Sequence, residues 1–320
     1  MNILITGSAG FIGFHLANQL CQNKKNIVYG IDNFSNYYDV KLKKKRNQIL
    51  KKYKNFKFFK IDISSNKLSN IFKKNKIDLV FHLAAQAGVR LSVSEPKKYL
   101  NSNIVGFFNI LENCKSHKIK HLIFASSSSV YGDPKKIPMD EILTNTDRPL
   151  SFYAATKKSN EVMAYSYSAI YKIPITCLRF FTVYGPWGRP DMFFYKILNS
   201  AKNKKTFTVY DYGNHYRDFT YIDDVIKMMI KILNFKSNDQ VPFRLLNIGE
   251  GKPIKLKKII KLVEKIYGPK IKIKFYPRQL GDVKTTFAAS TRIKKLANFF
   301  NFTDLSEGIK SYIAWFDKYY

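Results

Sequence analysis

Short apolar runs alternate with longer helical stretches over the first 182 residues. The short runs are β-branched or aromatic and nearly all apolar, as strands are when both faces of a sheet are buried. This alternation predicts a doubly wound α/β domain, a parallel sheet with helices on both faces and right-handed crossovers. The expected strands are Asn2–Thr6, Ile27–Ile31, Phe56–Ile61, Leu79–Leu83, His121–Ala125 and Ile175–Phe180. The expected helices are Phe11–Asn23, Tyr38–Tyr53, Leu68–Lys74, Glu95–Ser116 and Ser151–Tyr171.

The pattern changes after residue 182. Glycines and prolines in Tyr184–Asp191 predict a loop. Phe219–Leu233 reads as a helix and Phe243–Gly249 as a strand, and both are expected to return to the first sheet. We therefore expect a first domain over residues 1–182, completed by 219–249, and a smaller mixed α/β lobe over 183–320.

Charge is the unusual feature of the composition. The chain has 320 residues, and 55 basic minus 23 acidic residues gives a net charge of +32. Lysines outnumber arginines 46 to 9, although arginine is the residue that binds phosphates and bases in a bidentate manner. Lysine comes with much Asn, Ile, Phe and Tyr, the amino acids of A/T-rich codons. Our hypothesis is that genome composition set the charge, so no nucleic-acid partner is expected; binding to a polyanion that survives physiological salt would overturn it.

Three scattered cysteines, Cys21, Cys114 and Cys177, are too few for a disulfide framework and favour a reducing compartment. The N-terminus lacks the pattern of a signal peptide, and no uninterrupted apolar run has membrane-spanning length. We expect a cytoplasmic protein without membrane insertion.

The first strand runs into a glycine-rich turn, Gly7-Ser-Ala-Gly10-Phe11-Ile12-Gly13, which a helix follows. Glycines allow a tight turn and a close approach of the backbone to a pyrophosphate, which the helix N-terminus attracts. Asp32 ends the second strand, 19 residues beyond Gly13. A carboxylate there binds ribose hydroxyls and repels a 2′-phosphate, so the pattern predicts a Rossmann-like domain that binds NAD.

The residues that follow the third and fourth strands are also expected at the NAD site, because open α/β sheets bind ligands at the carboxyl ends of their strands. Asp62 could bind the adenine amino group, and small residues after the fourth strand would let the backbone lie beside the cofactor. The further candidate cofactor-binding residues from these segments are Asn33, Ile63, Leu83, Ala84, Ala85 and Gln86.

Tyr153 and Lys157 are four residues apart near the start of a predicted helix, so both side chains lie on one helical face. A nearby ammonium and the nicotinamide charge would lower the pKa of the phenol. Tyr153 could then act as general acid and base on a sugar hydroxyl, and Lys157 could also bind the nicotinamide ribose. A solvated helix face explains the pair equally well in isolation.

Four serines, Ser126–Ser129, follow the fifth strand at the edge where the cofactor is expected. A hydroxyl there could donate to the reacting sugar oxygen and relay a proton to Tyr153. Ser127 is the first candidate and Ser128 the second, whereas a polar loop suffices to explain Ser126 and Ser129.

With these motifs the chain resembles the extended short-chain dehydrogenase/reductase family over nearly its whole length. Four segments are most similar to the UDP-glucuronate 4-epimerases within it: Ala85–Arg90, Asn101–Gly106, Arg179–Asp191 and Arg217–Asp224. Two departures occur, in Gln279-Leu280-Gly281-Asp282 and at Ala289. Both concern nucleotide contacts and leave the catalytic residues unchanged.

The resemblance implies roles for individual residues. Tyr153, Lys157 and Ser127 would be catalytic, and Asn103 would steady the backbone beside the cofactor. Phe180 and Val183 would line the nicotinamide pocket. Thr182 and Arg217 would hold the UDP portion, and Arg189 the sugar carboxylate. Arg90, Ser127 and Asp282 complete the substrate-side set.

The implied reaction is NAD-dependent epimerisation at carbon 4 of UDP-glucuronate to UDP-galacturonate through a 4-keto intermediate. A UDP-glucose-type 4-epimerase or a UDP-glucuronate decarboxylase would use the same machinery, and a non-catalytic NAD-binding sensor is a further alternative. The resemblance also implies a homodimer formed by the helices Glu95–Ser116 and Ser151–Tyr171.

No metal site is expected. Cys114, His117 and His121 have suggestive spacing, but they span a helix end and a strand start without an evident fourth ligand. His15 and His82 fall in core or strand-end contexts, and His215 falls in a predicted loop, where an exposed side chain is expected.

Overall fold

The computed structural model describes residues 1–237, 239–278 and 283–320, and they form two compact units. Neither unit is one continuous piece of chain. Unit 1 consists of Met1–Gly132, Thr146–Arg179 and Met229–Leu246. Unit 2 consists of Asp133–Asn145, Phe180–Met228 and Asn247–Tyr320.

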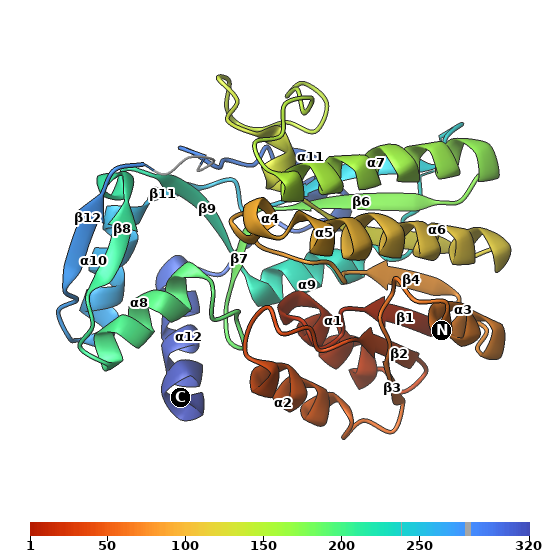
Figure 1. Cartoon of the computed structure of the whole chain (residues 1–320), viewed down its shortest axis with the longest axis horizontal. Coiled ribbons are helices and arrows are strands. Elements are labelled where there is room, and N and C mark those ends of the chain that lie inside the picture. Colours follow the sequence, from red (N-terminus) through yellow and green to blue (C-terminus); the bar gives the residue numbers. More distant parts are fainter. Residues whose placement is uncertain (238, 279–282) are drawn as a thin grey trace. The chain divides into compact units, whose positions relative to one another are not determined.

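A seven-stranded sheet forms the centre of unit 1, in the order β10-β6-β5-β4-β1-β2-β3 (Figure 1). Pairing is parallel between β1 and β2, β1 and β4, β2 and β3, and β4 and β5. Successive strands move outward from β1 in both directions, so the expectation of a doubly wound sheet is confirmed. The strands are β1 Asn2–Thr6, β2 Ile27–Asp32, β3 Phe56–Lys60, β4 Leu79–His82, β5 His121–Ser127, β6 Ile175–Phe180 and β10 Phe243–Ile248.

The helices of unit 1 lie close to their predicted positions, with one irregularity. The stretch expected as a helix over Glu95–Ser116 contains a π-helical segment, η1, just before α6. Helices α6 and α7 run side by side (Figure 1). The elements are α1 Phe11–Gln22, α2 Val40–Leu50, α3 Lys67–Lys74, α4 Leu91–Ser94, α5 Pro96–Tyr99, η1 Leu100–Val105, α6 Gly106–Ser116, η2 Ser128–Tyr131 and α7 Phe152–Tyr171.

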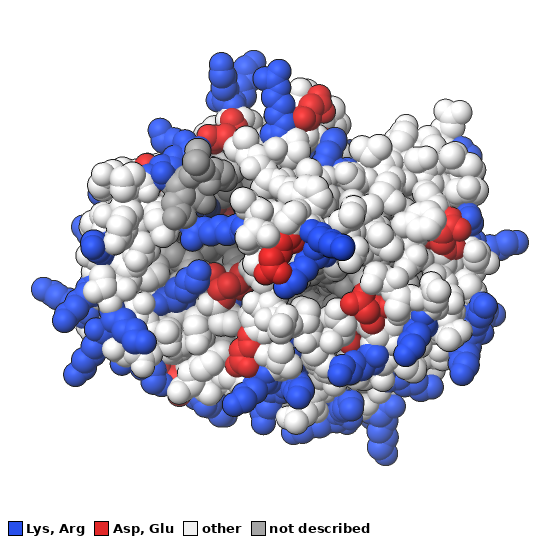
Figure 2. Space-filling model, in the orientation of Figure 1, with Lys and Arg blue, Asp and Glu red and all other residues white. Residues whose placement is uncertain are grey.

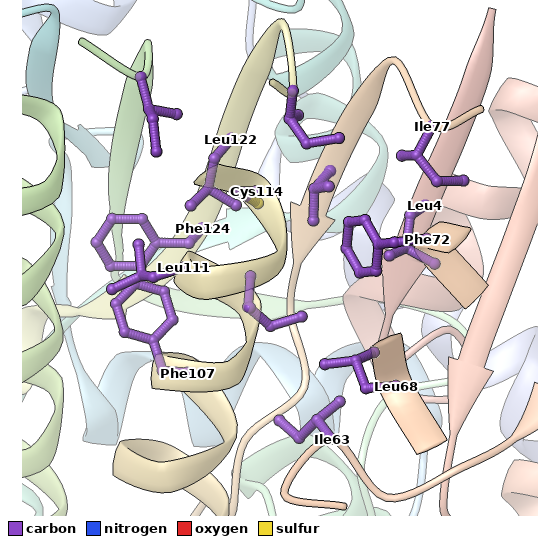
Figure 3. Close-up of a cluster of buried hydrophobic side chains, with 14 of the residues drawn as sticks. Leu4, Ile63, Leu68, Phe72, Ile77, Phe107, Leu111, Cys114, Leu122 and Phe124 are labelled. Carbon is purple, nitrogen blue, oxygen red and sulfur yellow. The ribbon is translucent and has the colours of Figure 1, made fainter. Parts of the chain in front are cut away.

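Apolar side chains from α3 and α6 pack against one face of this sheet (Figure 3). Phe107 of α6 and Phe124 of β5 are fully buried, and their ring centroids lie 4.8 Å apart. Leu4 and Leu122 bring the neighbouring strands into the same cluster. Burial of each such side chain stabilises the fold by about 1.5–3 kcal/mol, so this layer holds the strand ends rigidly in place.

Unit 2 combines short strands with helices. Its three-stranded sheet has the order β11-β9-β7, and β8 pairs in parallel with β12. The elements are β7 Thr182–Tyr184, α8 Phe193–Lys202, β8 Phe207–Tyr210, η3 Asp211–Gly213, β9 Tyr216–Tyr221, α9 Ile222–Lys231, β11 Pro253–Lys255, α10 Leu256–Tyr267, β12 Ile273–Tyr276, α11 Thr291–Ala297 and α12 Leu305–Tyr319. Helix α9 continues past the boundary of the unit at Met228.

The helix expected over Phe219–Leu233 is wrong at its start. Phe219 and Tyr221 belong to β9, and the helix begins at Ile222. Phe219 pairs with Thr182 of β7 in parallel, and Asp218 pairs with Pro253 of β11. Pairing with strands distant in sequence therefore outweighs a short helical pattern.

Basic side chains are scattered over the visible surface with acidic ones among them (Figure 2). Over the described ranges, no helix is both long enough and apolar enough to cross a lipid bilayer.

Candidate active site

The turn between β1 and α1 requires its glycines. Gly7 has φ +73°, a conformation that side chains with a β-carbon rarely adopt. A β-carbon at Gly13 would lie 2.1 Å from the carbonyl oxygen of Gly7, and one at Gly10 would lie 2.9 Å from the same atom. The turn can therefore close only with glycines at these positions.

The N-terminus of α1 suits an anion. The N-cap residue is Gly10, which has no side chain to bond the first-turn N–H groups of Phe11, Ile12 and Gly13, and this turn contains no acidic residue. These donors and the positive end of the helix dipole fit the pyrophosphate of a dinucleotide. Phe11 is buried and Ile12 half-buried, so side chains on this turn anchor it to the unit.

Asp32 ends β2 next to this turn. Its Oδ2 accepts a hydrogen bond from the backbone N–H of Ala9 at 3.1 Å, and Oδ1 accepts one from Phe34 at 2.8 Å. Burial raises the pKa of Asp32, while these hydrogen bonds and the charges of Lys43 and Arg46 oppose the rise. The carboxylate is thereby fixed beside the glycine turn, where a ribose hydroxyl could reach it.

Asn33 and Asp62 lie together, because Asn33 Nδ2 donates to Asp62 Oδ2 at 2.8 Å. Both side chains are exposed. Ile63 has a different environment: its side chain is in the apolar cluster, and its carbonyl oxygen accepts from Asn109 Nδ2 at 3.0 Å. The side chain of Ile63 is therefore part of the core.

The segment after β4 is tied to β1. His82 Nδ1 lies 2.8 Å from Thr6 Oγ1, which also accepts from the N–H of Ala84 at 3.2 Å. Burial and the charge of Lys157 lower the pKa of His82 to about 3, so the imidazole is neutral and serves as a structural group. Leu83, Ala84 and Ala85 are half-buried, and Gln86 is buried.

Asn103 joins this segment to α7. Its Oδ1 accepts from the N–H of Gln86 at 2.7 Å, and its Nδ2 donates to the Gln86 carbonyl oxygen at 3.1 Å and to Thr156 Oγ1 at 3.0 Å. Asn160 Nδ2 in turn donates to the Asn103 carbonyl oxygen at 2.7 Å. Asn103 lies in the π-helical segment, a feature that often marks functional sites.

Tyr153 is in the first turn of α7, whose N-cap Ser151 accepts from Ala154 N–H. The Tyr153 ring is half-buried and meets the Tyr99 ring edge to face, with centroids 6.2 Å apart. Lys157, one turn later, is 3% exposed, and its Nζ donates to the carbonyl oxygen of Ala125 at 2.8 Å. The explanation of this pair as a solvated helix face is wrong, because the ammonium is buried against the end of β5.

Burial lowers the pKa of Lys157 to about 8, against the opposing charges of Cys177 and Glu161. An ammonium one helical turn from Tyr153 favours the phenolate form of the tyrosine. Tyr153 can therefore act as a general acid and base beside the buried ammonium of Lys157.

Ser127 ends β5 and caps η2. Its Oγ accepts from the Ser129 N–H at 3.2 Å and lies 3.1 Å from Ser129 Oγ. Ser128 is half-buried in the first turn of η2. Ser126 has a role that a polar loop does not explain, since its Oγ donates to Glu161 at 2.6 Å.

Unit 2 holds the other candidates. Phe180 and Val183 are buried and Thr182 is half-buried. Arg217 Nη1 donates to the carbonyl oxygens of Tyr216 and Lys284, at 2.9 and 3.2 Å.

Arg189 is paired with Asp191 through two hydrogen bonds, Nε to Oδ1 at 3.0 Å and Nη2 to Oδ2 at 2.6 Å. On the substrate side, Arg90 of unit 1 is exposed at the start of α4. Asp282 and the three residues before it lie outside the described residues.

The histidines do not form a metal centre. Both ring nitrogens of His121 are bonded, Nδ1 to the Leu233 carbonyl oxygen and Nε2 to Thr176 Oγ1. In the described part of the chain, no group of three or more His, Cys, Asp or Glu could hold a metal ion. The expectation of an exposed His215 is wrong: it is 3% exposed, and the Leu256 N–H bonds its carbonyl oxygen.

Two charged residues next to the candidate site were missed in the sequence. Glu161 and Arg179 form a buried ion pair beside Ser126 and Lys157. Glu161 could have been found from the sequence, because Tyr153, Lys157 and Glu161 follow one another at intervals of four residues on one helix. No local spacing links Arg179 to them, because it comes from another strand.

Comparison with known proteins identifies the family of the chain. Residues 3–249 match the model of the NAD dependent epimerase/dehydratase family. The chain is 40% identical to the UDP-glucuronate 4-epimerase of Thermodesulfobacterium geofontis, over 98% of this chain and 95% of that protein. A probable UDP-glucuronate 4-epimerase of Rhizobium meliloti is also 40% identical, over 100% and 98%.

Among solved structures, the UDP-glucuronic acid 4-epimerase of Bacillus cereus in complex with UDP-glucuronic acid and NAD has a TM-score of 0.93. It is 35% identical, and the match covers 100% of both chains. The prediction of an extended short-chain dehydrogenase/reductase is confirmed. This chain belongs to the NAD dependent epimerase/dehydratase family.

Proposed function

We propose that this chain catalyses the NAD-dependent epimerisation of UDP-glucuronate at carbon 4, which yields UDP-galacturonate. The observation that carries the proposal is the buried Lys157, held against the end of β5 one turn from Tyr153. Its relatives named UDP-glucuronate 4-epimerases match nearly the whole chain, which supports the choice of substrate.

The residues of unit 1 fit NAD. The Gly7–Gly13 turn and the N-terminus of α1 would hold the pyrophosphate, and Asp32 the adenosine ribose. Phe180 and Val183 are proposed to line the nicotinamide pocket. When bound, NAD supplies a reversible hydride acceptor.

Tyr153 supplies the proton transfers. As phenolate it takes the proton of the carbon 4 hydroxyl while that carbon is oxidised to the ketone, and it returns the proton when the carbon is reduced from the opposite face. Lys157 stabilises the phenolate by its charge. Ser127, or Ser128 as second candidate, donates a hydrogen bond to the reacting oxygen.

The 4-keto sugar acid poses a chemical hazard. Its ketone is β to the carboxylate, and such acids lose carbon dioxide readily. Arg189 is proposed to pair with the carboxylate and so oppose the movement of charge into an enolate, because a planar guanidinium suits bidentate binding. Thr182 and Arg217 are proposed to hold the UDP portion, with Arg90 and Asp282 as further substrate-side candidates.

Incubation of the purified protein with UDP-glucuronate, followed by separation of uronic acids and pentoses, tests the proposal. A mixture of UDP-glucuronate and UDP-galacturonate is the expected result. UDP-pentose as the main product would instead indicate a decarboxylase, and turnover of UDP-glucose but not of the acid would indicate a neutral-sugar epimerase. Binding of NAD without any turnover would indicate a sensor.

The enzyme is proposed to act as a homodimer through α6 and α7. Large apolar side chains are exposed on these helices, with 45% exposure at Phe108, 59% at Val162 and 65% at Ile170. Exposed groups of this kind are typical of helix faces that pack against a partner. Analytical ultracentrifugation would give twice the 37.3 kDa monomer mass if the proposal is correct.

We propose the cytoplasm as its location. The three cysteines are free and buried, which suits a reducing compartment. Fractionation of the source cells with an antibody to the chain tests this location, and recovery from the membrane or the medium would contradict it.

A further inference from the structure

Glu161 and Arg179 form a buried ion pair next to the candidate acid–base residues of unit 1. Glu161 accepts two hydrogen bonds from Arg179, Nε to Oε1 at 2.8 Å and Nη2 to Oε2 at 2.7 Å. The two side chains are 4% and 2% exposed. A buried pair of this kind is costly to desolvate and stabilises a fold weakly at best, so its presence calls for another explanation.

The pair contacts every element that carries a candidate acid–base residue. Glu161 is on α7, two turns after Tyr153 and one turn after Lys157, on the same helical face. Ser126, the neighbour of Ser127, donates to Glu161 Oε1 at 2.6 Å. The guanidinium carbon of Arg179 lies 4.7 Å from the ring centroid of Tyr131, the last residue of η2.

These contacts fix the register between α7 and the end of β5. Lys157 Nζ bonds the Ala125 carbonyl oxygen, and Glu161 bonds the side chain of the next residue, Ser126. Ser127 follows Ser126 directly in the chain, so the bond that holds Ser126 against Glu161 also fixes the backbone of Ser127. Because a misplacement of 1 Å can cost about 100-fold in rate, such a device matters for proton transfer.

We infer that Glu161 and Arg179 are positioning residues, which hold Ser127 and Lys157 in the geometry and charge state that Tyr153 needs. The inference rests on the proposed function. It assigns a catalytic consequence to two buried side chains that form an ion pair with each other.

The charges around Lys157 make the inference testable. Glu161 on its own helix raises the pKa of Lys157, as does Cys177 of β6 when ionised, and His82 of β4 is neutral. Arg179 of β6 offsets the charge of Glu161. Removal of Glu161 alone should therefore weaken protonation of Lys157, and removal of Arg179 alone should strengthen it.

The experiment compares Glu161→Gln, Arg179→Met and the double variant with the wild type. We expect kcat to fall by about 10- to 100-fold in both single variants, with little change in KM. The alkaline limb of the pH–rate profile should move down by about one unit in Glu161→Gln and up in Arg179→Met. The double variant should return the limb toward the wild-type position, which a general loss of stability could not do.

Glu141→Gln is the matched control. Glu141 is similarly buried, at 5% exposure, and accepts the Asn247 N–H at 2.8 Å within unit 2. Its substitution should leave the alkaline limb in place. The inference would be overturned if both single variants kept the wild-type kcat and the wild-type alkaline limb. It would also be overturned if the alkaline limb moved in the same direction in both variants.

Two further measurements apply if the single variants do not fold or if the wild type shows no epimerase activity. If the single variants do not fold, Ser126→Ala removes only one hydrogen bond, and an unchanged kcat there would overturn the inference. If the wild type does not epimerise UDP-glucuronate, the proposed function fails by itself. The pH dependence of the Lys157 Nζ chemical shift, followed by NMR without NAD, then still decides whether the two variants shift its protonation in opposite directions.

Discussion

Arg189 and Asp191 form a two-pronged ion pair within one short loop, with nitrogen–oxygen distances of 3.0 and 2.6 Å. The donors that are proposed to receive the sugar carboxylate are thus already bound to a carboxylate of the chain. Asp191→Asn should remove this competitor and lower KM for UDP-glucuronate by about two- to fivefold. This factor corresponds to the free energy that a partly exposed ion pair contributes. Steady-state kinetics with UDP-glucose as the neutral control would show no such gain, and equal gains for both sugars would contradict the competition.

Replacement of Arg189 itself should have the opposite effect on the acid. Arg189→Ala should lower kcat/KM for UDP-glucuronate by about 10- to 100-fold, the range for a charged hydrogen bond, and raise the share of pentose product. Product chromatography measures both effects. Arg189→Lys keeps the positive charge but lacks the planar guanidinium. Its kcat/KM for UDP-glucuronate should lie between the values for the wild type and Arg189→Ala. Unchanged activity on the acid would reject the role of Arg189.

Tyr153→Phe should reduce epimerisation by about 100- to 10,000-fold, because it removes the proposed acid–base group. NAD binding, followed by fluorescence titration, should stay as in the wild type. Tyr165→Phe is the control, since Tyr165 is on the same helix but 52% exposed. Substantial activity in Tyr153→Phe would mean that another group transfers the proton.

Lys157, a proposed catalytic residue, should also affect stability. Its pKa is 10.5 in the reference state and about 8 in the fold. Between these values the unfolded chain binds the extra proton, so this lysine makes the free energy of unfolding rise with pH, by about 3 kcal/mol in total. Lys157→Met should lack that rise and should be the more stable protein at pH 7, although it is less active.

Denaturant unfolding of the NAD-free protein from pH 7 to 10.5 measures this effect. The difference between wild type and Lys157→Met isolates it from the other groups that titrate in the range. Parallel curves for the two proteins would show that the ammonium is not destabilised by burial.

Asp32 should set the choice of cofactor. Asp32→Asn removes the charge that repels a 2′-phosphate, while the amide oxygen can still accept a backbone hydrogen bond from Ala9 or Phe34. The ratio of Kd values for NADP and NAD, from calorimetry, should fall by about tenfold. A ratio equal to that of the wild type would mean that another feature excludes the phosphate.

The strands of the large sheet could be predicted because nearly every side chain in them is apolar. Asn2–Thr6 and Ile175–Phe180 have the predicted bounds, and the other strands of unit 1 differ by a residue or two. The glycine turn was visible for a related reason, since few other residues fit there. These features depend on local sequence, so the sequence alone reveals them.

What the sequence did not reveal depends on distant partners. Phe219–Tyr221 consists of strand-favouring residues, but it runs directly into a helical pattern, and it becomes a strand by pairing with β7. The buried state of Lys157 depends on Ala125, and the pairing of Glu161 depends on Arg179 from another strand. A lysine or a glutamate on a helix looks solvent-exposed until the neighbouring strand is in place.

The interleaved course of the chain has a consequence for synthesis. Unit 1 takes its last segment from Met229–Leu246, which follows the whole of unit 2's segment Phe180–Met228 in the chain. An emerging polypeptide therefore cannot complete unit 1 until Leu246 has left the ribosome, although β1 to β5 are available much earlier. A fragment that ends at Arg179 would expose the edge of β6 where β10 belongs, and it would be a substrate for chaperones rather than a smaller working enzyme.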